Sequence, residues 1–185
     1  YAIILGSGIY TYELDSHFRC NGSDGYIAWL NNLLEIKETA NFDIDGFDYD
    51  FKVFDDPNEM RKAIEEKNKI NNKSRIVAGY CWDWISEGKN KTDVYDITIP
   101  DYNFEISWNL GNSQTWAIDP ESVNEAGCIH TCQGLEFDYV GVIIGDDMRY
   151  ENDHIVTDFT KRASTDTSIK GLKKLMAKNP SEAEK

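Results

Sequence analysis

The apolar segment Tyr139–Ile144 constrains the fold of this chain more than any other feature. It reads Tyr-Val-Gly-Val-Ile-Ile without alternation, which is typical of a strand buried in a parallel sheet. The stretch before it, from Cys128 to Asp138, is mostly polar and contains one glycine, Gly134. An α/β protein delivers side chains to the ligand-binding edge of its sheet through such turns. The sequence therefore predicts an α/β protein with a candidate site in residues 128–138.

The remaining predicted elements agree with this class. Apolar runs or alternation predict strands at 2–5, 49–54 and 75–79, and a hairpin of 97–99 with 104–106. Helical spacing predicts helices at about 23–35, from Asp56 to Asn71, and around 169–176. Asp56 is a suitable cap for the second helix, with Pro57 at its first position. The order favours one domain over residues 1–185, built on a largely parallel sheet.

Residues 80–118 interrupt this pattern, and we expect them to form an insertion. They contain Trp82, Trp84, Trp108 and Trp116. Tryptophans gathered in this way usually form a core beneath a long loop. The alternative is that some of them stack on nucleic-acid bases.

Composition limits the classes of function. The net charge of −14 argues against a stand-alone nucleic-acid binder, because phosphate contacts need clustered Lys and Arg. Four cysteines at irregular spacing suit a reducing cytoplasm, and no apolar run is long enough to cross a membrane. The first residue is Tyr1, so we interpret the chain as a piece of a longer cytoplasmic protein.

The segment 128–138 holds residues that suit nucleotide and nucleic-acid binding. Gly134 allows the backbone to approach a ligand closely. Glu136 can accept hydrogen bonds from two ribose hydroxyls, and His130 and Thr131 can donate to phosphate oxygens. The alternative interpretation is an ordinary strand, turn and helix with a satisfied histidine.

A metal site receives weaker support. The Gly-x-x-x-x-Gly-Lys-Ser/Thr phosphate loop that usually accompanies such a site is not present in this sequence. The segment Val142–Asp147 is apolar and then acidic, as in a magnesium-binding strand of such proteins. A metal-dependent hydrolase built on Asp146, Asp147 and the acidic residues of 43–56 stays open as an alternative.

Two segments resemble helicase motifs. His-Thr-Cys-Gln-Gly-Leu-Glu-Phe-Asp at 130–138 resembles motif V of superfamily 1 helicases, and Phe18-Arg19 before a predicted helix resembles motif IV. Together, the segments 18–26, 75–82 and 128–147 make the chain similar to the bacterial family described as Schlafen group 3-like DNA/RNA helicase domains. The resemblance runs from about residue 13 to 176. In place of the Thr and Lys frequent in motif V, the chain has Cys128 and Gln133.

The resemblance implies the second RecA-like domain of a P-loop ATPase or helicase that ends before motif VI. An N-terminal P-loop domain would bind ATP and Mg²⁺, and DNA or RNA would be the polymer. Arg19 would be the catalytic arginine at the terminal phosphate of ATP. Gln133, Gly134 and Glu136 would bind the nucleotide, and His130 and Thr131 the nucleic acid. This piece alone would be inactive. The alternative function is a non-enzymatic acidic protein-interaction module with degenerate motor motifs.

Overall fold

The computed structural model describes residues 24–41, 43–44, 49–85, 94–109, 115–132 and 134–179. The chain divides into two compact units, Tyr1–Lys52 and Val53–Lys185. Each unit is described by itself. The predicted strand at 2–5 and Arg19 lie outside the described residues.

The first unit contains the helix α1 (Asp24–Leu33), which confirms the helix predicted at 23–35. The strand predicted at 49–54 is wrong, because these described residues form no strand. Tyr49 and Phe51 pack their aromatic side chains on α1 instead. Tyr49 stacks on Tyr26 with ring centroids 3.8 Å apart, and Phe51 meets Trp29 edge-on at 4.9 Å. Alternation here reflects aromatic packing against a helix, not a sheet.

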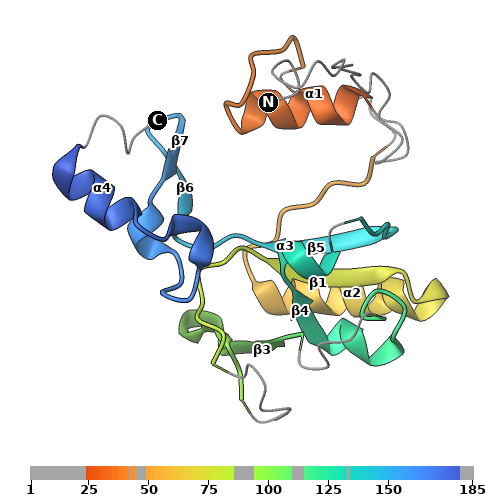
Figure 1. The fold of residues 1–185 in the computed structure, drawn as a ribbon. Coiled ribbons are helices and arrows are strands. Elements are labelled where there is room, and N and C mark those ends of the chain that lie inside the picture. The colour runs from red at the N-terminus through yellow and green to blue at the C-terminus, as the bar shows by residue number, and fades with distance from the viewer. Residues whose placement is uncertain are drawn as a thin grey trace, which may run out of the picture. The chain divides into compact units, whose positions relative to one another are not determined.

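The second unit is built on a five-stranded sheet in the order β2-β3-β4-β1-β5 (Figure 1). β3, β4, β1 and β5 are mutually parallel, and β2 is antiparallel to β3. The expectation of an α/β fold with a largely parallel sheet is confirmed. The bounds are β1 (Ser74–Ala78), β2 (Ile97–Ile99), β3 (Phe104–Trp108), β4 (Glu125–Gly127) and β5 (Tyr139–Ile143).

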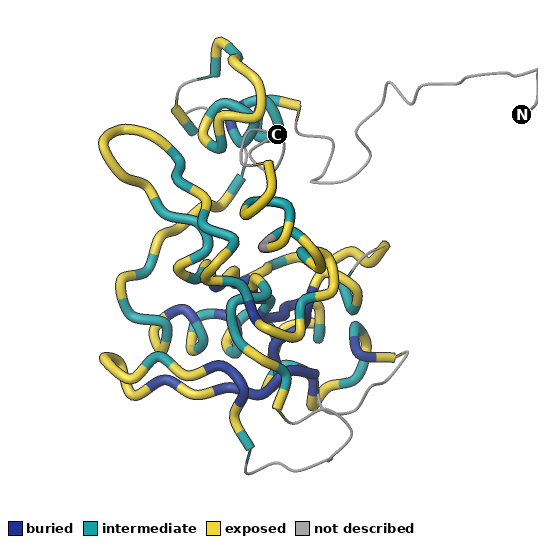
Figure 2. Tube along the Cα trace, turned by 60° about the vertical axis from the view of Figure 1, so that its left-hand side comes forward, coloured by how far each residue is buried: buried dark blue, intermediate teal, exposed yellow. Residues whose placement is uncertain are grey.

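The helix α2 (Pro57–Asn71) covers one face of the sheet. As the sequence predicts, the carboxylate of Asp56 caps it by accepting from the Asn58 amide, and Asn72 ends it in the left-handed conformation. The register places Ile76 beside Ala126 and Gly141. A Cβ at Gly141 would lie 2.2 Å from the sulfur of Met60, so glycine is required for α2 to approach β5. Figure 2 shows the buried residues following the strands of this sheet.

The opposite face is covered unevenly. Trp116 lies on Gly127 of β4, and the ring of Phe137 meets the ring of Trp116 edge-on with centroids 5.8 Å apart. Along β5 the same face is open. Val140, Val142 and Ile144 are 45%, 59% and 58% exposed. β5 is therefore buried on one face only, although its sequence is typical of a strand buried on both.

The predicted insertion 80–118 supplies two strands of the sheet itself. β2 and β3 pair as the predicted hairpin, joined by the short 3-10 helix η2 (Pro100–Tyr102). Trp108 and Trp116 are 0% and 2% exposed. These two tryptophans therefore belong to the core, as their clustering suggested.

The chain beyond β5 contains an unexpected hairpin of β6 (Met148–Glu151) and β7 (His154–Thr157). Asn152 and Asp153 both have positive φ and form its two-residue turn. Three helical segments complete the described chain: η4 (Phe159–Lys161), η5 (Thr167–Ile169) and α4 (Leu172–Lys178). α4 confirms the predicted closing helix.

Candidate functional site

The carboxyl ends of β3, β4, β1 and β5 lie along one edge of the sheet, because these four strands run in the same direction. Ligands of α/β proteins bind at this edge. Three described segments begin there: 79–85 after β1, the short helix α3 (Ile129–Cys132) after β4, and 144–147 after β5.

Thr131 on α3 is fixed by its neighbours. Its hydroxyl donates to Asn109 Oδ1 at 3.1 Å, at the end of β3, and lies 3.3 Å from the sulfur of Cys128. Cys128 is 2% exposed and Asn109 is 5% exposed. His130 on the same turn is exposed. The structure therefore places His130 and Thr131 together at the carboxyl edge, one facing solvent and one held by β3.

Cys132 closes the turn of α3. Its thiol donates to the carbonyl of Cys128 at 3.1 Å, and burial raises the pKa of this thiol. A thiol with a raised pKa is a poor nucleophile and a poor metal ligand at neutral pH. Its contacts give Cys132 a structural role in this turn.

The segment after α3 returns to the other edge of the sheet. Gly134 has φ of +86°, a conformation that favours glycine, and both Gly134 and Glu136 are exposed. Phe137 packs on Trp116, and the amide of Asp138 donates to the carbonyl of Lys73, just before β1. Residues 128–138 thus connect the two edges. Gln133 lies outside the described residues.

A second polar cluster lies where β1 and β5 end, and the sequence did not reveal it. The thiol of Cys81 donates to Asp147 Oδ1 at 2.8 Å. Arg162 contacts Asp147 at 3.4 Å and Asp166 at 2.7 Å, joining both carboxylates. Burial, followed by the hydrogen bond with Asp147, raises the pKa of Cys81 to about 11. Cys81 is therefore a neutral thiol at physiological pH.

Asp83 holds the segment around η4 against the same edge. Its carboxylate accepts from the amide of Ser164 at 2.7 Å, from the Ser164 hydroxyl at 3.0 Å and from the Thr165 amide at 3.3 Å. The bond with Ser164 is the largest cause lowering the pKa of Asp83. Nearby, the amide of Ala163 donates to the carbonyl of Tyr80 at 2.8 Å. These bonds fix Lys161 and Arg162 next to the segments that follow β1 and β5.

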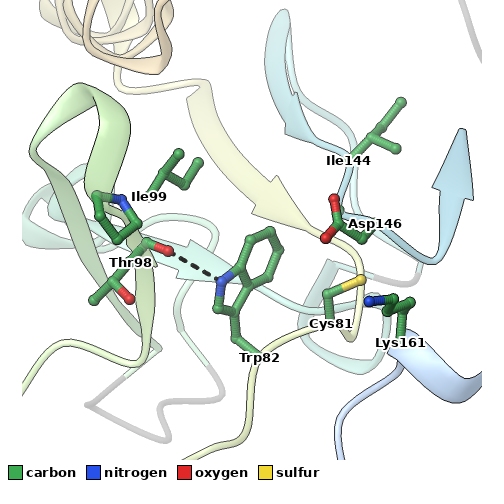
Figure 3. A pocket seen from close by; sticks show the side chains of 9 residues that line it. Cys81, Trp82, Thr98, Ile99, Ile144, Asp146 and Lys161 are labelled. Atoms are coloured by element: carbon green, nitrogen blue, oxygen red, sulfur yellow. Dashed lines mark hydrogen bonds between the residues drawn. The ribbon is translucent and has the colours of Figure 1, made fainter.

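Between these segments is an open cavity of about 300 Å³ (Figure 3). Its walls include Cys81 and Trp82 after β1, Ile99 of β2, Ile144 and Asp146 after β5, and Lys161 of η4. In the described part of the chain, no group of three or more His, Cys, Asp or Glu side chains is arranged to hold a metal ion. The carboxylate of Asp147 binds Cys81 and Arg162.

The fold and its carboxyl edge define an α/β domain of the kind that binds ligands beyond its strands. A model of the family described as Schlafen group 3, DNA/RNA helicase domain matches residues 4–185. The chain therefore belongs to this family and is a nucleic-acid helicase-related domain. The family resemblance inferred from 18–26, 75–82 and 128–147 is confirmed.

One known relative is a longer protein of which this chain matches a part. The uncharacterized protein YPL245W of Saccharomyces cerevisiae is 29% identical over 155 residues, covering 76% of this chain. The match covers 33% of that yeast protein, so the chain spans about a third of the relative's length. No solved structure matches the chain. Among the described helices, none combines the length and apolar character required to cross a bilayer.

Proposed function

We propose that this chain is the C-terminal, second RecA-like domain of a superfamily 1-like, nucleic-acid-dependent ATPase or helicase. One observation supports this function above all others. The sequence that resembles motif V begins at the carboxyl end of β4 and leads into β5 of a parallel sheet. A motor domain needs its nucleotide and nucleic-acid contacts at such an edge.

In this proposal an N-terminal P-loop domain binds ATP and Mg²⁺, and this chain closes over the nucleotide. Arg19 stabilises the charge on the terminal phosphate, for which a planar and permanently charged guanidinium is suited. Gln133, Gly134 and Glu136 contact the nucleotide. His130 and Thr131 contact the nucleic acid. Residues 130–136 form one continuous segment. Opening and closing of the two domains would therefore change its contacts with the nucleotide and with the nucleic acid together.

The test is ATP hydrolysis by the intact protein with a saturating single strand. Arg19→Ala should lower kcat by roughly 10³-fold, which is the typical effect of removing an arginine finger. Arg61→Ala is the matched control, because Arg61 on α2 forms an ion pair with Glu65 at 3.1 Å and lies on a helix that covers the sheet. Its kcat should stay near that of the unmodified protein.

An unchanged kcat in Arg19→Ala would remove this arginine from the reaction. Absence of any ATP hydrolysis, together with salt-sensitive binding of a basic protein, would instead favour the acidic interaction module. The net charge of −14 is the observation behind that second candidate.

A further inference from the structure

The tryptophans after β1 divide into two groups. Trp108 and Trp116 are buried, and Trp84 packs on Trp108 with ring centroids 6.3 Å apart. Trp82 is half-buried and lines the cavity at the carboxyl edge. Trp82 and Trp84 both pack against the core, and of the four residues Trp82 is the one that also lines the cavity.

The ring of Trp82 is held in a fixed orientation. Its indole N–H donates to the carbonyl of Thr98 at 3.3 Å. A Cβ added at Gly145 would meet the ring at 3.2 Å, so the chain after β5 passes close beside the ring. Figure 3 shows the indole between Thr98 and Ile99 on one side and Asp146 and Cys81 on the other. A fixed aromatic wall loses little entropy when a flat ligand packs on it.

Charged groups of both signs lie at the rim. Asp146 and Lys161 line the cavity, and both residues are exposed. Arg162, next to Lys161, forms ion pairs with Asp147 and Asp166. The apolar part of the lining comes from Trp82, Ile99 and Ile144. This combination matches a flat heteroaromatic ring that carries hydrogen-bond donors and is joined to an anionic group.

We propose that the cavity binds one nucleobase of a single-stranded nucleic acid. The base stacks on Trp82, Asp146 accepts a hydrogen bond from a base N–H, and Lys161 pairs with the adjoining phosphate. The volume of about 300 Å³ is at the lower end for ligand pockets and accommodates one such group. The inference rests on the proposed nucleic-acid function and adds a base contact outside residues 128–138.

The test measures binding of a fluorescein-labelled single-stranded oligonucleotide to the intact protein by fluorescence anisotropy at low salt. Trp82→Ala should raise the Kd about 10-fold, from loss of one stacked base, whereas Trp82→Phe should stay within about 3-fold. Tyr150→Ala is the matched control, because Tyr150 is an aromatic residue of β6 with 63% exposure. It should leave the Kd unchanged. On an oligonucleotide of abasic sites, Trp82→Ala and the unmodified chain should bind equally.

Lys161→Ala gives a second line of evidence that does not depend on replacing the half-buried Trp82. Lys161 is exposed, so its removal leaves the fold intact. It should weaken binding of the normal and abasic strands alike, and should reduce the slope of log Kd against log salt by about 1.

The outcomes separate this inference from the proposed function. Strand binding that is unaffected by both Trp82→Ala and Lys161→Ala would overturn the pocket and leave nucleic-acid binding intact. If adenosine monophosphate binds in a way that depends on Trp82 but no strand binds, the pocket accepts a base. That result would contradict the proposal that the base belongs to a single strand. If neither ligand binds, the pocket inference is overturned, and the ATP hydrolysis of the intact protein still tests the motor function.

Discussion

The two edges of the sheet differ in how their arginine side chains are buried and paired. At the amino edge, Arg75 of β1 is 0% exposed, and its described hydrogen bonds all go to neutral oxygens. At the carboxyl edge, Arg162 is partly exposed and contacts two carboxylates, Asp147 and Asp166. The first arrangement encloses a charge within the fold, and the second leaves charges where a ligand can reach them.

Arg75 connects three segments of the amino edge. Its guanidinium donates to Asn68 at 2.8 Å and Asn72 at 3.1 Å, at the end of α2. It also donates to the carbonyls of Ala117 and Asp119, each at 2.9 Å. Burial lowers its pKa, and the charge of Asp119 opposes that shift. These bonds hold the chain just after Trp116, whose ring covers β4 and supports Phe137.

The carboxyl edge is less enclosed, and its polar groups belong to segments distant in sequence. Cys81 and Asp147 are 66 residues apart, and Arg162 comes 15 residues after Asp147. Partly exposed polar groups at the edge of a rigid sheet are what a binding site requires. The amino edge stabilises the domain, and we propose that the carboxyl edge carries its function.

The largest expected effect is on the amino edge. Arg75→Met removes hydrogen bonds from several buried carbonyl oxygens and should lower the free energy of unfolding by about 3–5 kcal/mol. Urea denaturation followed by circular dichroism measures this change. Arg162→Met is the matched variant at the carboxyl edge. Because Arg162 is one-third exposed and Asp166 also accepts from the Ser168 amide, this variant should cost about 1–2 kcal/mol. Equal losses in both variants would contradict the difference between the edges.

A glycine pair compares the packing beneath Trp116, where β4 ends, with the packing just after β1. A Cβ at Gly127 would lie 2.5 Å from the ring of Trp116. Gly127→Ala should therefore cost about 1–3 kcal/mol through overpacking. At the carboxyl edge, a Cβ at Gly79 would have its nearest contact at 4.0 Å, with Asp147. Gly79→Ala should change the stability by less than about 0.5 kcal/mol in urea denaturation. A larger loss for Gly79→Ala would contradict the open packing around Gly79.

The smallest effect is a pH dependence at Cys81. Its pKa in the folded protein is about 11, raised from an ordinary value of 9.0. The unfolded chain therefore loses the thiol proton first as the pH rises. The contribution of this group is fully present below pH 9 and is lost progressively between about pH 9 and 11. Urea denaturation across this range should show a steeper decline for the unmodified chain than for Cys81→Ala. Parallel curves would remove Cys81 as the cause.

The sequence predicted those parts of the fold whose signals are local. The cap at Asp56, the proline after it and Asn72 determine the ends of α2, and the apolar run at 139–143 determines β5. The β6–β7 hairpin also had a local signal, the Asn152-Asp153 turn between two alternating segments, which was missed. The error at 49–54 has a different cause. Alternation shows that two faces differ, but it does not show that a neighbouring strand exists.

The candidate site was only partly accessible from sequence. The segment 128–138 could be found because its residues are consecutive and resemble a known motif. The cluster of Cys81, Asp147 and Arg162 could not, since sheet pairing and η4 bring these residues together from three separate segments. The same applies to the cavity beside Trp82, whose walls come from β2, η4 and the segments that follow β1 and β5.

The most direct test of the account is hydrogen–deuterium exchange of the intact protein, with and without a single strand and a non-hydrolysable ATP analogue. The account predicts ligand-dependent protection at the carboxyl edge, in 79–83, 128–132 and 158–162, and in residues 134–136, which lead away from it. Residues 71–75 and 117–121 at the amino edge should exchange equally in both states. Protection confined to the amino edge would contradict the assignment of function to the carboxyl ends of the strands.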